Sequence, residues 1–315
     1  MSPLDVRVST LRQALPAAVT EDLPLPGRGA TAERFEALFD LARRDLELAR
    51  LAEAHHDARA IAAELGAVLP EGALYGVWAA AGPDPLVAEH RTHGYRLRGV
   101  ATWCTGVGIV DRALVTARLG ATSVLVDVPV AEGRRARHAA TWVSPAFAAT
   151  NTSSLRFDLN IDANAVLGEA GDYLRRPGFW HGAMGVAACW AGGAHGLYEE
   201  HHRRWKREDP HSLAHLGSAY AWSDAMQAVL GRAAAAIDAD PHDYAGAEAR
   251  ARSVRHVIER LCTALVDDLG VGAGPEPLAF DETIVARAQQ LQLYIRQCHG
   301  ERDLAPLGRH LIDQR

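Results

Sequence analysis

The stretch that decides how this chain folds is Gly94–Gly106, which reads GYRLRGVATWCTG. Residues 95–103 form a strand-like run, and Thr105 and Gly106 after it are typical of a turn. A second strand-like run, residues 113–119, follows almost at once. No helix-length pattern separates the two runs, so we expect them in an antiparallel arrangement and not in βαβ units.

The surrounding sequence extends this pattern from about residue 71 to residue 170. Further strand-like runs occupy residues 74–78, 123–128 and 153–159, and turn residues such as Gly82–Pro85 and Glu132-Gly133 separate them. Residues 71–170 are therefore predicted to form an antiparallel sheet or barrel.

Helical patterns flank this zone on both sides. In residues 1–70, apolar residues recur near the 3.6-residue period from Phe35 to Leu65, and Thr31 is a plausible N-cap. In residues 171–315, four long alanine-rich segments are predicted helices with short connections, which favours a bundle: 178–205, 211–237, 244–269 and 281–298. The predicted fold is α+β, with an N-terminal helical domain (1–70), a central antiparallel β-domain (71–170) and a C-terminal four-helix bundle (171–315).

Composition limits the function. The 315 residues carry 33 Lys and Arg against 39 Asp and Glu, a net charge of −6, which argues against nucleic acid as a partner. Only Lys206 is a lysine, and it lies in a charge run, so neither a phosphate-binding P-loop nor a Schiff-base lysine is available. Residues 1–20 have no apolar core of the signal-peptide type, and no 18-residue apolar run occurs. We expect a cytoplasmic protein with no membrane partner.

Several local motifs are weak. His211 and His215 have the i,i+4 spacing of two metal ligands, but Ser212 breaks the zincin pattern, so we interpret them as solvated and expect no metal site. Four dispersed cysteines form no Cys-x-x-Cys pair. The glycine-rich segment 270–274 follows no strand, which favours an interhelical loop over a dinucleotide site.

Taken together, three segments resemble the acyl-CoA dehydrogenase family of flavoproteins. Residues 94–106, followed by Asp111–Ala117, are similar to its middle-domain signature, in which Gly-Tyr-x-Leu-x-Gly leads to Trp-x-Ser/Thr. Residues 157–168 resemble the family's exit from the β-domain, and 178–188 its first bundle helix. The resemblance covers roughly residues 71–312.

The resemblance implies FAD as cofactor and a homodimer or tetramer. It assigns Trp103 to packing on the flavin and Thr105 to a hydrogen bond near its N5 edge; a flat flavin needs an aromatic wall and a polar group at the redox edge. Gln297 and Gly300 match the family's Gln-x-x-Gly-Gly segment, which contacts the FAD diphosphate of a neighbouring subunit. Arg203 and Arg204 fall near a family arginine that meets the cofactor across a dimer interface, although a solvated basic cluster is an equal interpretation.

Departures from the family leave the reaction open. Trp78 stands in the place of a Thr that the family directs at the flavin pyrimidine, and both usual positions of the catalytic Glu are empty, with Glu301 as the nearest substitute. The first hypothesis is an FAD-dependent dehydrogenase or oxidase acting on a small molecule of the acyl-thioester kind. The alternatives are a flavin-dependent monooxygenase on the same fold, which needs no Glu base, and a non-catalytic member that keeps the fold.

Overall fold

The computed structural model describes residues 2–80, 82, 85–136 and 142–314. The chain divides into two compact units, neither of them contiguous in sequence. The first unit comprises residues up to Asp22 together with Leu51–Phe179, and the second comprises Leu23–Arg50 with Trp180–Arg315.

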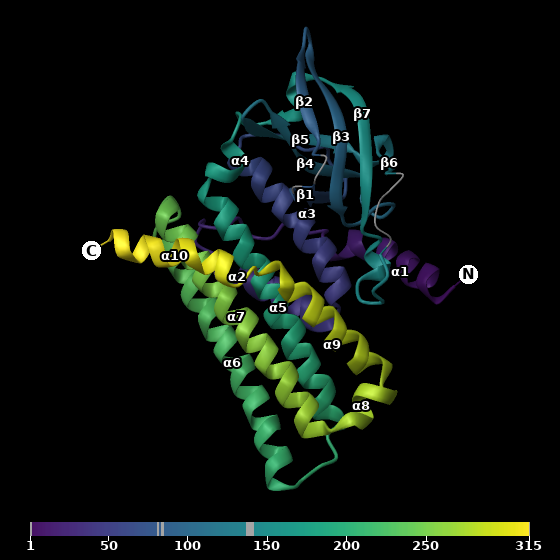
Figure 1. Ribbon diagram of the computed structural model, residues 1–315, viewed down its shortest axis with the longest axis vertical. Helices are drawn as coiled ribbons and strands as arrows, with labels where there is room; N and C mark the ends of the chain where they lie inside the picture. The colour runs from purple at the N-terminus through teal and green to yellow at the C-terminus, as the bar shows by residue number, and fades with distance from the viewer. Residues whose placement is uncertain (1, 81, 83–84, 137–141, 315) are drawn as a thin grey trace. The chain divides into compact units, whose positions relative to one another are not determined.

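The first unit is built on an eight-stranded sheet. Its helices are α1 (Pro3–Ala18), most of α3 (Leu46–Glu64) and the short α4 (Asp172–Arg175). Within the described residues the strands are β1 (Tyr75–Trp78), β2 (Val87–Arg91), β3 (Gly94–Cys104), β4 (Arg112–Leu119), β5 (Thr122–Pro129), β6 (Arg134–Arg135), β7 (Ser153–Ile161) and β8 (Val166–Leu167). The strand order is β6-β7-β3-β2-β4-β5-β8, with β1 beside β4 (Figure 1).

The prediction of antiparallel pairing is confirmed for most of this sheet. The ladders β2·β3, β3·β7, β4·β5, β5·β8 and β6·β7 are antiparallel. The tight β4–β5 turn uses Gly120, whose φ of 59° lies in the left-handed region. β1 and β4 are instead parallel, because the β2–β3 hairpin intervenes and supplies the long connection that parallel strands require. β2, β6 and β8 were not expected from sequence, and the predicted turn at 82–85 includes residues 83–84, which lie outside the described residues.

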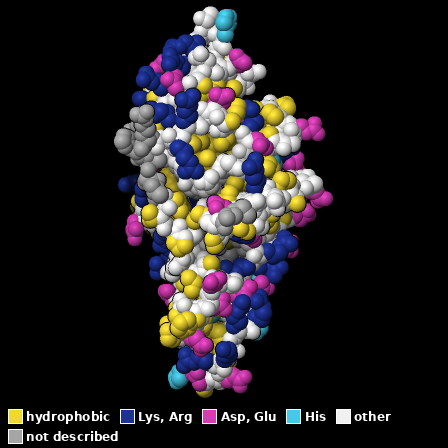
Figure 2. Space-filling view, turned by 90° about the vertical axis from the view of Figure 1, so that its right-hand side faces the viewer, with side chains coloured by type: hydrophobic (Ala, Val, Ile, Leu, Met, Phe, Trp, Pro, Cys, Tyr) yellow, Lys and Arg dark blue, Asp and Glu magenta, His cyan; other side chains and the backbone are white. Residues whose placement is uncertain are grey.

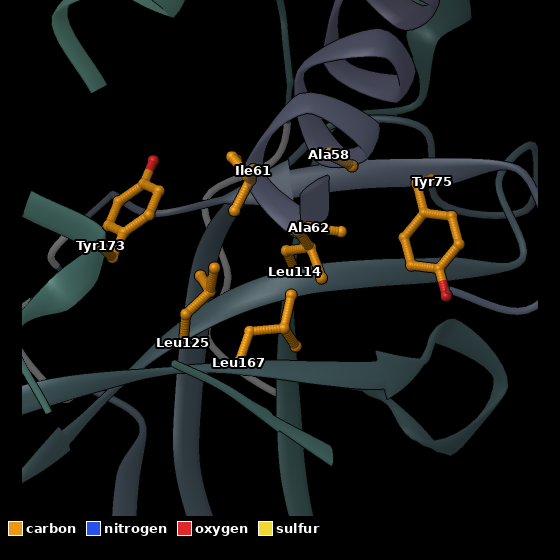
Figure 3. Close-up of a cluster of buried hydrophobic side chains, with 8 residues drawn as sticks. All are labelled: Ala58, Ile61, Ala62, Tyr75, Leu114, Leu125, Leu167 and Tyr173. Atoms are coloured by element: carbon orange, nitrogen blue, oxygen red, sulfur yellow. The ribbon is translucent and has the colours of Figure 1, made fainter. Parts of the chain in front are cut away.

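Helix α3 covers one part of the sheet through apolar side chains. Ala58, Ile61 and Ala62 of α3 pack with side chains of the sheet strands and α4, as Figure 3 shows: Tyr75, Leu114, Leu125, Leu167 and Tyr173. All eight residues are buried, so this cluster is the hydrophobic core through which α3 and α4 pack on the sheet.

The second unit is helical. It contains α2 (Thr31–Arg44), nearly all of α5 (Pro177–Arg204), α6 (Pro210–Ala239), α7 (Tyr244–Ala273), α8 (Pro275–Phe280), α9 (Glu282–Tyr294) and α10 (Glu301–Asp313). α6 and α7 are antiparallel: Ser212 Oγ donates to the Gly272 carbonyl at 2.8 Å, and the sulfur atoms of Met226 and Cys262 lie 3.5 Å apart. The predicted order of helices, sheet and helices is confirmed.

Small residues let α5 and α2 approach closely. A Cβ on Gly192 would lie 2.1 Å from the Phe39 carbonyl oxygen, and one on Gly196 would lie 2.3 Å from that of Arg43. Each of these glycines in the middle of α5 is therefore explained by a neighbouring backbone, as expected of a small-residue helix face.

Three sequence-based expectations about helices were wrong. The apolar pattern from Phe35 to Leu65 belongs to two helices and not to one continuous helix, because the backbone is extended at Asp45. The Asp45 carboxylate caps the second helix, α3, by accepting hydrogen bonds from the amides of Glu47 and Leu48. Thr31 is the first helical residue and not the N-cap. The glycine-rich segment 270–274 is helical as far as Ala273, and only Gly274, with φ of 78°, ends the helix.

Candidate functional site

The first feature of the candidate site is the end of β3. The β3·β7 ladder loses its register between Ala101 and Cys104, and within that bulge Trp103 takes φ of 58°. A left-handed backbone is a genuine outlier for so bulky a residue. The indole is 60% exposed although it is one of the largest apolar side chains in the unit. Strained residues of this kind concentrate at functional sites.

Two loops support this strained turn. Among the described residues, the non-glycine positions with positive φ are Trp103, Phe147 and Asn151. The Gly106 amide donates to the Thr150 carbonyl at 2.8 Å, and the Asn151 side-chain amide donates to the Val107 carbonyl. All three strained residues therefore belong to one structure, the 103–110 and 146–152 loops bound to each other.

Three threonine hydroxyls lie along the contact between these loops. The Oγ1 atoms of Thr105 and Thr152 are 3.0 Å apart, and those of Thr152 and Thr150 are 3.3 Å apart. Thr150 is fully buried and donates to the Phe147 carbonyl at 2.8 Å, whereas Thr105 is partly exposed. These contacts between hydroxyl groups hold the side chain of Thr105, which follows Trp103 by two residues.

Two further tryptophans hold the turn. Trp78 is buried, and its Nε1 donates to the Thr105 carbonyl at 3.0 Å, so it supports the turn from within the sheet. Trp142 meets Trp103 edge to face, with centroids 6.1 Å apart and planes at 89°, and its Nε1 donates to the Ala146 carbonyl at 2.9 Å. Sequence reasoning missed Trp142 and Thr152, because no local spacing links them to residue 103.

Arginines gather beside this loop pair. Arg98, Arg134 and Arg156 are exposed on β3, β6 and β7, and Arg134 lies directly opposite Arg156. Figure 2 looks on this side of the first unit and shows Lys and Arg side chains gathered in its upper part. Arg135 donates to the Asn151 side-chain oxygen at 2.8 Å and to Ser153 Oγ at 3.2 Å. Asp158 lies opposite Arg98 and pairs with Arg96, so arginines outnumber the acidic side chains named on these strands.

In the second unit, Arg203 and Arg204 lie at the end of α5 and are already paired. Arg203 contacts both carboxylate oxygens of Glu200, at 2.7 and 3.0 Å. Arg204 also binds Glu200 and reaches Asp281 at 2.8 Å. The hydrogen bonds from Arg203, opposed by burial and assisted by Arg204, lower the pKa of Glu200 to about 2. Both side chains remain exposed to solvent, so a cofactor role and a solvated basic cluster stay alternative interpretations of these arginines.

The remaining predicted site residues follow α9. The Gln297 carbonyl accepts a hydrogen bond from Arg255 at 3.0 Å, and Gly300, with φ of 55°, precedes α10. Glu301 is the exposed first residue of α10. No hydrogen bond or ion pair among the described residues joins this group to Arg203 and Arg204. The structure thus brings Trp78, Trp103 and Thr105 together, and leaves the second-unit candidates in two separate groups.

The histidine pair on α6 differs from expectation. His215 is not simply solvated: its Nδ1 lies 2.7 Å from Asp268, which also accepts a hydrogen bond from Trp222 at 2.8 Å. Within the described residues no group of three or more His, Cys, Asp or Glu side chains is arranged to hold a metal ion. Nor does any helix in that part of the chain combine the length and apolarity needed to cross a membrane.

Comparison with known proteins relates the chain to solved structures only, since no protein-family model and no curated protein sequence matches it. Dibenzothiophene monooxygenase TdsC from Paenibacillus sp. A11-2 superposes with a TM-score of 0.76 and 19% identity, over 99% of this chain and 97% of that one. The HsaA monooxygenase from M. tuberculosis superposes with a TM-score of 0.73 and 15% identity, over 98% of this chain and 97% of that one. Methanesulfinate monooxygenase MsuC from Pseudomonas fluorescens superposes with a TM-score of 0.73 and 16% identity, over 100% of this chain and 98% of that one. At these identities the likeness establishes the fold, and the chain has the acyl-CoA dehydrogenase-like fold that these monooxygenases share.

Proposed function

We propose that this protein is a flavin-dependent monooxygenase of a small organic molecule, with Trp103 as the wall on which the flavin stacks. The observation that carries the proposal is the exposed indole of Trp103, held in a strained conformation by two loops on a rigid sheet. The likeness in fold to TdsC, HsaA and MsuC supports the same reaction class.

The residues around Trp103 fit a flavin ring. Trp142 meets the indole with the two ring planes nearly perpendicular, and 60% of the Trp103 side chain remains exposed. A flat aromatic ring gains most from such a surface when it stacks with an offset. The Thr105 hydroxyl lies two residues along the chain, is partly exposed, and belongs to a group that can both donate and accept a hydrogen bond, as a polar edge of the ring requires.

When bound, a reduced flavin supplies two electrons to O2, so that one oxygen atom enters the substrate and the other leaves as water. The residues of this chain would orient the flavin ring. Trp103 fixes its plane, Thr105 fixes one edge, and Trp78 holds the Thr105 backbone through its carbonyl. Each of these groups is held by a contact with a neighbouring side chain, so little ordering is left to do on binding.

Two observations support FMN as the proposed cofactor in place of the FAD implied by the resemblance. Arg203 and Arg204, the arginines assigned to the cofactor phosphates, are engaged by Glu200 and Asp281. A diphosphate would have to displace a carboxylate that two guanidinium groups stabilise. Solved TdsC and KijD3 contain FMN. We therefore propose FMN as the cofactor, with Gln297 and Gly300 as unassigned candidates for contacts to it.

Glu301, the substitute base of the dehydrogenase hypothesis, does not have the environment that this role requires. Abstraction of an α-proton needs a carboxylate with a pKa raised towards the working pH, as burial would provide. Glu301 is exposed at the start of α10. Glu301→Gln tests the hypothesis directly: it should abolish flavin reduction by an acyl-CoA only if Glu301 is the base.

The first experiment is flavin binding by wild type and Trp103→Ala, with Phe280→Ala, an 86% exposed aromatic on α8, as the matched control. Stacking of a flat ring on an aromatic side chain contributes about 1–3 kcal/mol to binding, by analogy with the stacking of nucleic-acid bases. The Kd for FMN should therefore rise roughly tenfold to a hundredfold in Trp103→Ala. Phe280→Ala should bind as wild type does. Equal flavin affinity in all three proteins would remove Trp103 from the site, and no flavin binding by wild type would favour the non-catalytic alternative.

A second experiment separates the two reactions. The reduced flavin complex is mixed with O2 in a stopped-flow instrument, and the oxidised complex is incubated anaerobically with butyryl- and octanoyl-CoA. A monooxygenase reoxidises rapidly with O2 and is not bleached by the thioesters. Bleaching by either thioester, with slow reoxidation, would instead establish the dehydrogenase.

A further inference from the structure

The bulge near the end of β3 turns the side chain of Trp103 onto the outer face of the sheet. Before the bulge the side chains alternate, with Leu97 and Ala101 buried and Arg98 exposed on the opposite face. Strict alternation from Ala101 would bury Trp103 and expose Cys104. Instead Cys104 is buried and Trp103 is 60% exposed. The extra residue that the register shift between Ala101 and Cys104 supplies is the cause, because a bulge redirects a side chain.

The same outer face carries arginines on three neighbouring strands. Arg156 of β7 lies opposite Val100 of β3 and opposite Arg134 of β6. Arg98 lies opposite Asp158, the next residue of β7 on this face. Directly opposite residues of an antiparallel pair share one face of the sheet. We call Arg98, Arg134 and Arg156, all of them exposed, the outer arginine row.

The charge of this row is not neutralised by the acid beside it. Asp158 is engaged by Arg96, whose Nε and Nη2 lie 3.0 and 2.9 Å from one carboxylate oxygen. In the described part of the chain, the guanidinium groups of Arg98 and Arg134 form no hydrogen bond or ion pair. Arg134 also lies directly opposite Arg156, and like charges in such a pair are destabilising. An anionic ligand would remove this repulsion.

The row lies within reach of a group tethered to a ring on Trp103. Arg156 is opposite Val100, three positions before Trp103 on β3. At about 3.3 Å per residue this separation is about 10 Å along the strand. In FMN a ribityl chain separates the phosphate from the flat ring, and the long arginine side chains shorten the distance that this chain must cover. Ring and phosphate can therefore lie on one face of one sheet.

We propose that the outer arginine row binds the phosphate of the flavin that stacks on Trp103. This assignment rests on the proposed function. A guanidinium group donates two parallel hydrogen bonds to a phosphate, which a lysine cannot do. Arg98 and Arg134 have no ion pair to break, whereas Arg203 and Arg204 would have to release Glu200.

The test compares the Kd for FMN with the Kd for riboflavin, which has the same ring and no phosphate, by fluorescence titration. In Arg134→Gln and in Arg156→Gln the Kd for FMN should rise roughly tenfold or more, because a hydrogen bond between charged groups is lost. The Kd for riboflavin should not change. Arg118→Gln, at an exposed arginine of β4 outside the row, is the matched control and should bind both flavins as wild type does.

The two flavins separate failure of this assignment from failure of the proposed function. A wild type that binds riboflavin as tightly as FMN, or row variants that weaken both flavins equally, would overturn the phosphate site and leave the ring site standing. A wild type that binds neither flavin would overturn both proposals. Loss of the preference for FMN in Arg203→Gln, with Arg134→Gln and Arg156→Gln unchanged, would place the phosphate at the end of α5 instead.

Thermal unfolding without ligand separates binding from folding. Arg134→Gln removes one charge of a like-charged pair, so its melting temperature should equal or exceed that of wild type. Arg134→Lys keeps the charge but not the planar fork, so its Kd for FMN should lie between those of wild type and Arg134→Gln. A lower melting temperature of unliganded Arg134→Gln would show that this arginine supports the sheet and would count against its place in the phosphate site.

Discussion

At the scale of single residues, the candidate site depends on side chains that hold one another in unusual conformations. A tryptophan in the left-handed region costs of order 1–3 kcal/mol and persists only when its surroundings determine it. Here the surroundings are the Thr105–Thr152 hydroxyl pair, the Trp78 hydrogen bond and the Trp142 edge contact. Trp78, Trp103 and Thr105 were named from the sequence as candidate site residues, whereas Thr152 and Trp142 were not.

Glu200 provides a prediction about pH at this scale. Its side chain is only 12% exposed and binds two arginines, which hold its pKa near 2 in the folded protein. An unfolded glutamate titrates near 4.5. The stability that ionised Glu200 contributes to the folded protein is therefore fully present above pH 4.5 and is lost as pH falls towards 2. We expect Glu200→Gln to lower the free energy of unfolding at pH 7 by about 1–2 kcal/mol, and this difference to shrink as pH falls.

Urea unfolding between pH 7 and pH 3 measures this difference. Glu208→Gln, an exposed carboxyl eight residues further along, is the control and should change little at any pH. A Glu200→Gln penalty that is the same at pH 3 as at pH 7 would show that ionisation of Glu200 is not its source.

At the scale of elements, periodicity located the helices, but distant side chains decide where some of them begin. Thr31 has the residue type of an N-cap, yet the cap at this helix comes from Asp238 on α6, 207 residues away. Asp238 accepts hydrogen bonds from the Gly29 amide at 3.1 Å, the Thr31 amide at 3.0 Å and the Thr31 hydroxyl at 2.5 Å. α2 is thereby fastened to α6.

We expect Asp238→Ala to destabilise the protein by about 2–3 kcal/mol, because it leaves two amides and a hydroxyl without their acceptor. Chemical denaturation followed by circular dichroism measures the change. Asp240→Ala, an exposed carboxylate just beyond the end of α6, should cost little. Equal effects of the two substitutions would argue that the Asp238 contacts contribute no net stability.

At the scale of the whole molecule, ligand binding couples the site to the stability of the fold. Any ligand that binds only the folded chain stabilises it by mass action, by about 2.7 kcal/mol at a hundredfold excess over Kd. For a protein of this size that corresponds to a rise of the melting temperature of about 5 °C. FMN should produce this shift in wild type and a smaller one in Trp103→Ala.

Differential scanning fluorimetry with FMN, FAD and riboflavin tests this prediction. Riboflavin measures the contribution of the ring alone, because it lacks the phosphate. FMN is expected to stabilise more than riboflavin and at least as much as FAD. A larger shift with FAD would favour the cofactor implied by the sequence resemblance, and no shift with any of the three would count against a flavin site.

The sequence by itself determined the order of helices, sheet and helices, and it proposed Trp78, at the end of β1, and Trp103 and Thr105, at the end of β3, as candidate site residues. The order of elements could be predicted because alternation and helical periodicity are local properties of the chain, whereas the candidate residues came from the resemblance of residues 94–106 to a known family. The division at residues 70 and 170 stays a prediction.

Only the tertiary structure decided what surrounds those residues. The pairing of Cys104 with Ser153 in the β3·β7 ladder brings the 146–152 loop, and with it Thr152 and Asn151, beside Trp103. In the same way, folding pairs Arg203 and Arg204 with Glu200 and caps α2 with Asp238. The physical reason is that β-pairing and helix packing join residues tens to hundreds of positions apart, and their register depends on the whole buried surface and not on any local pattern.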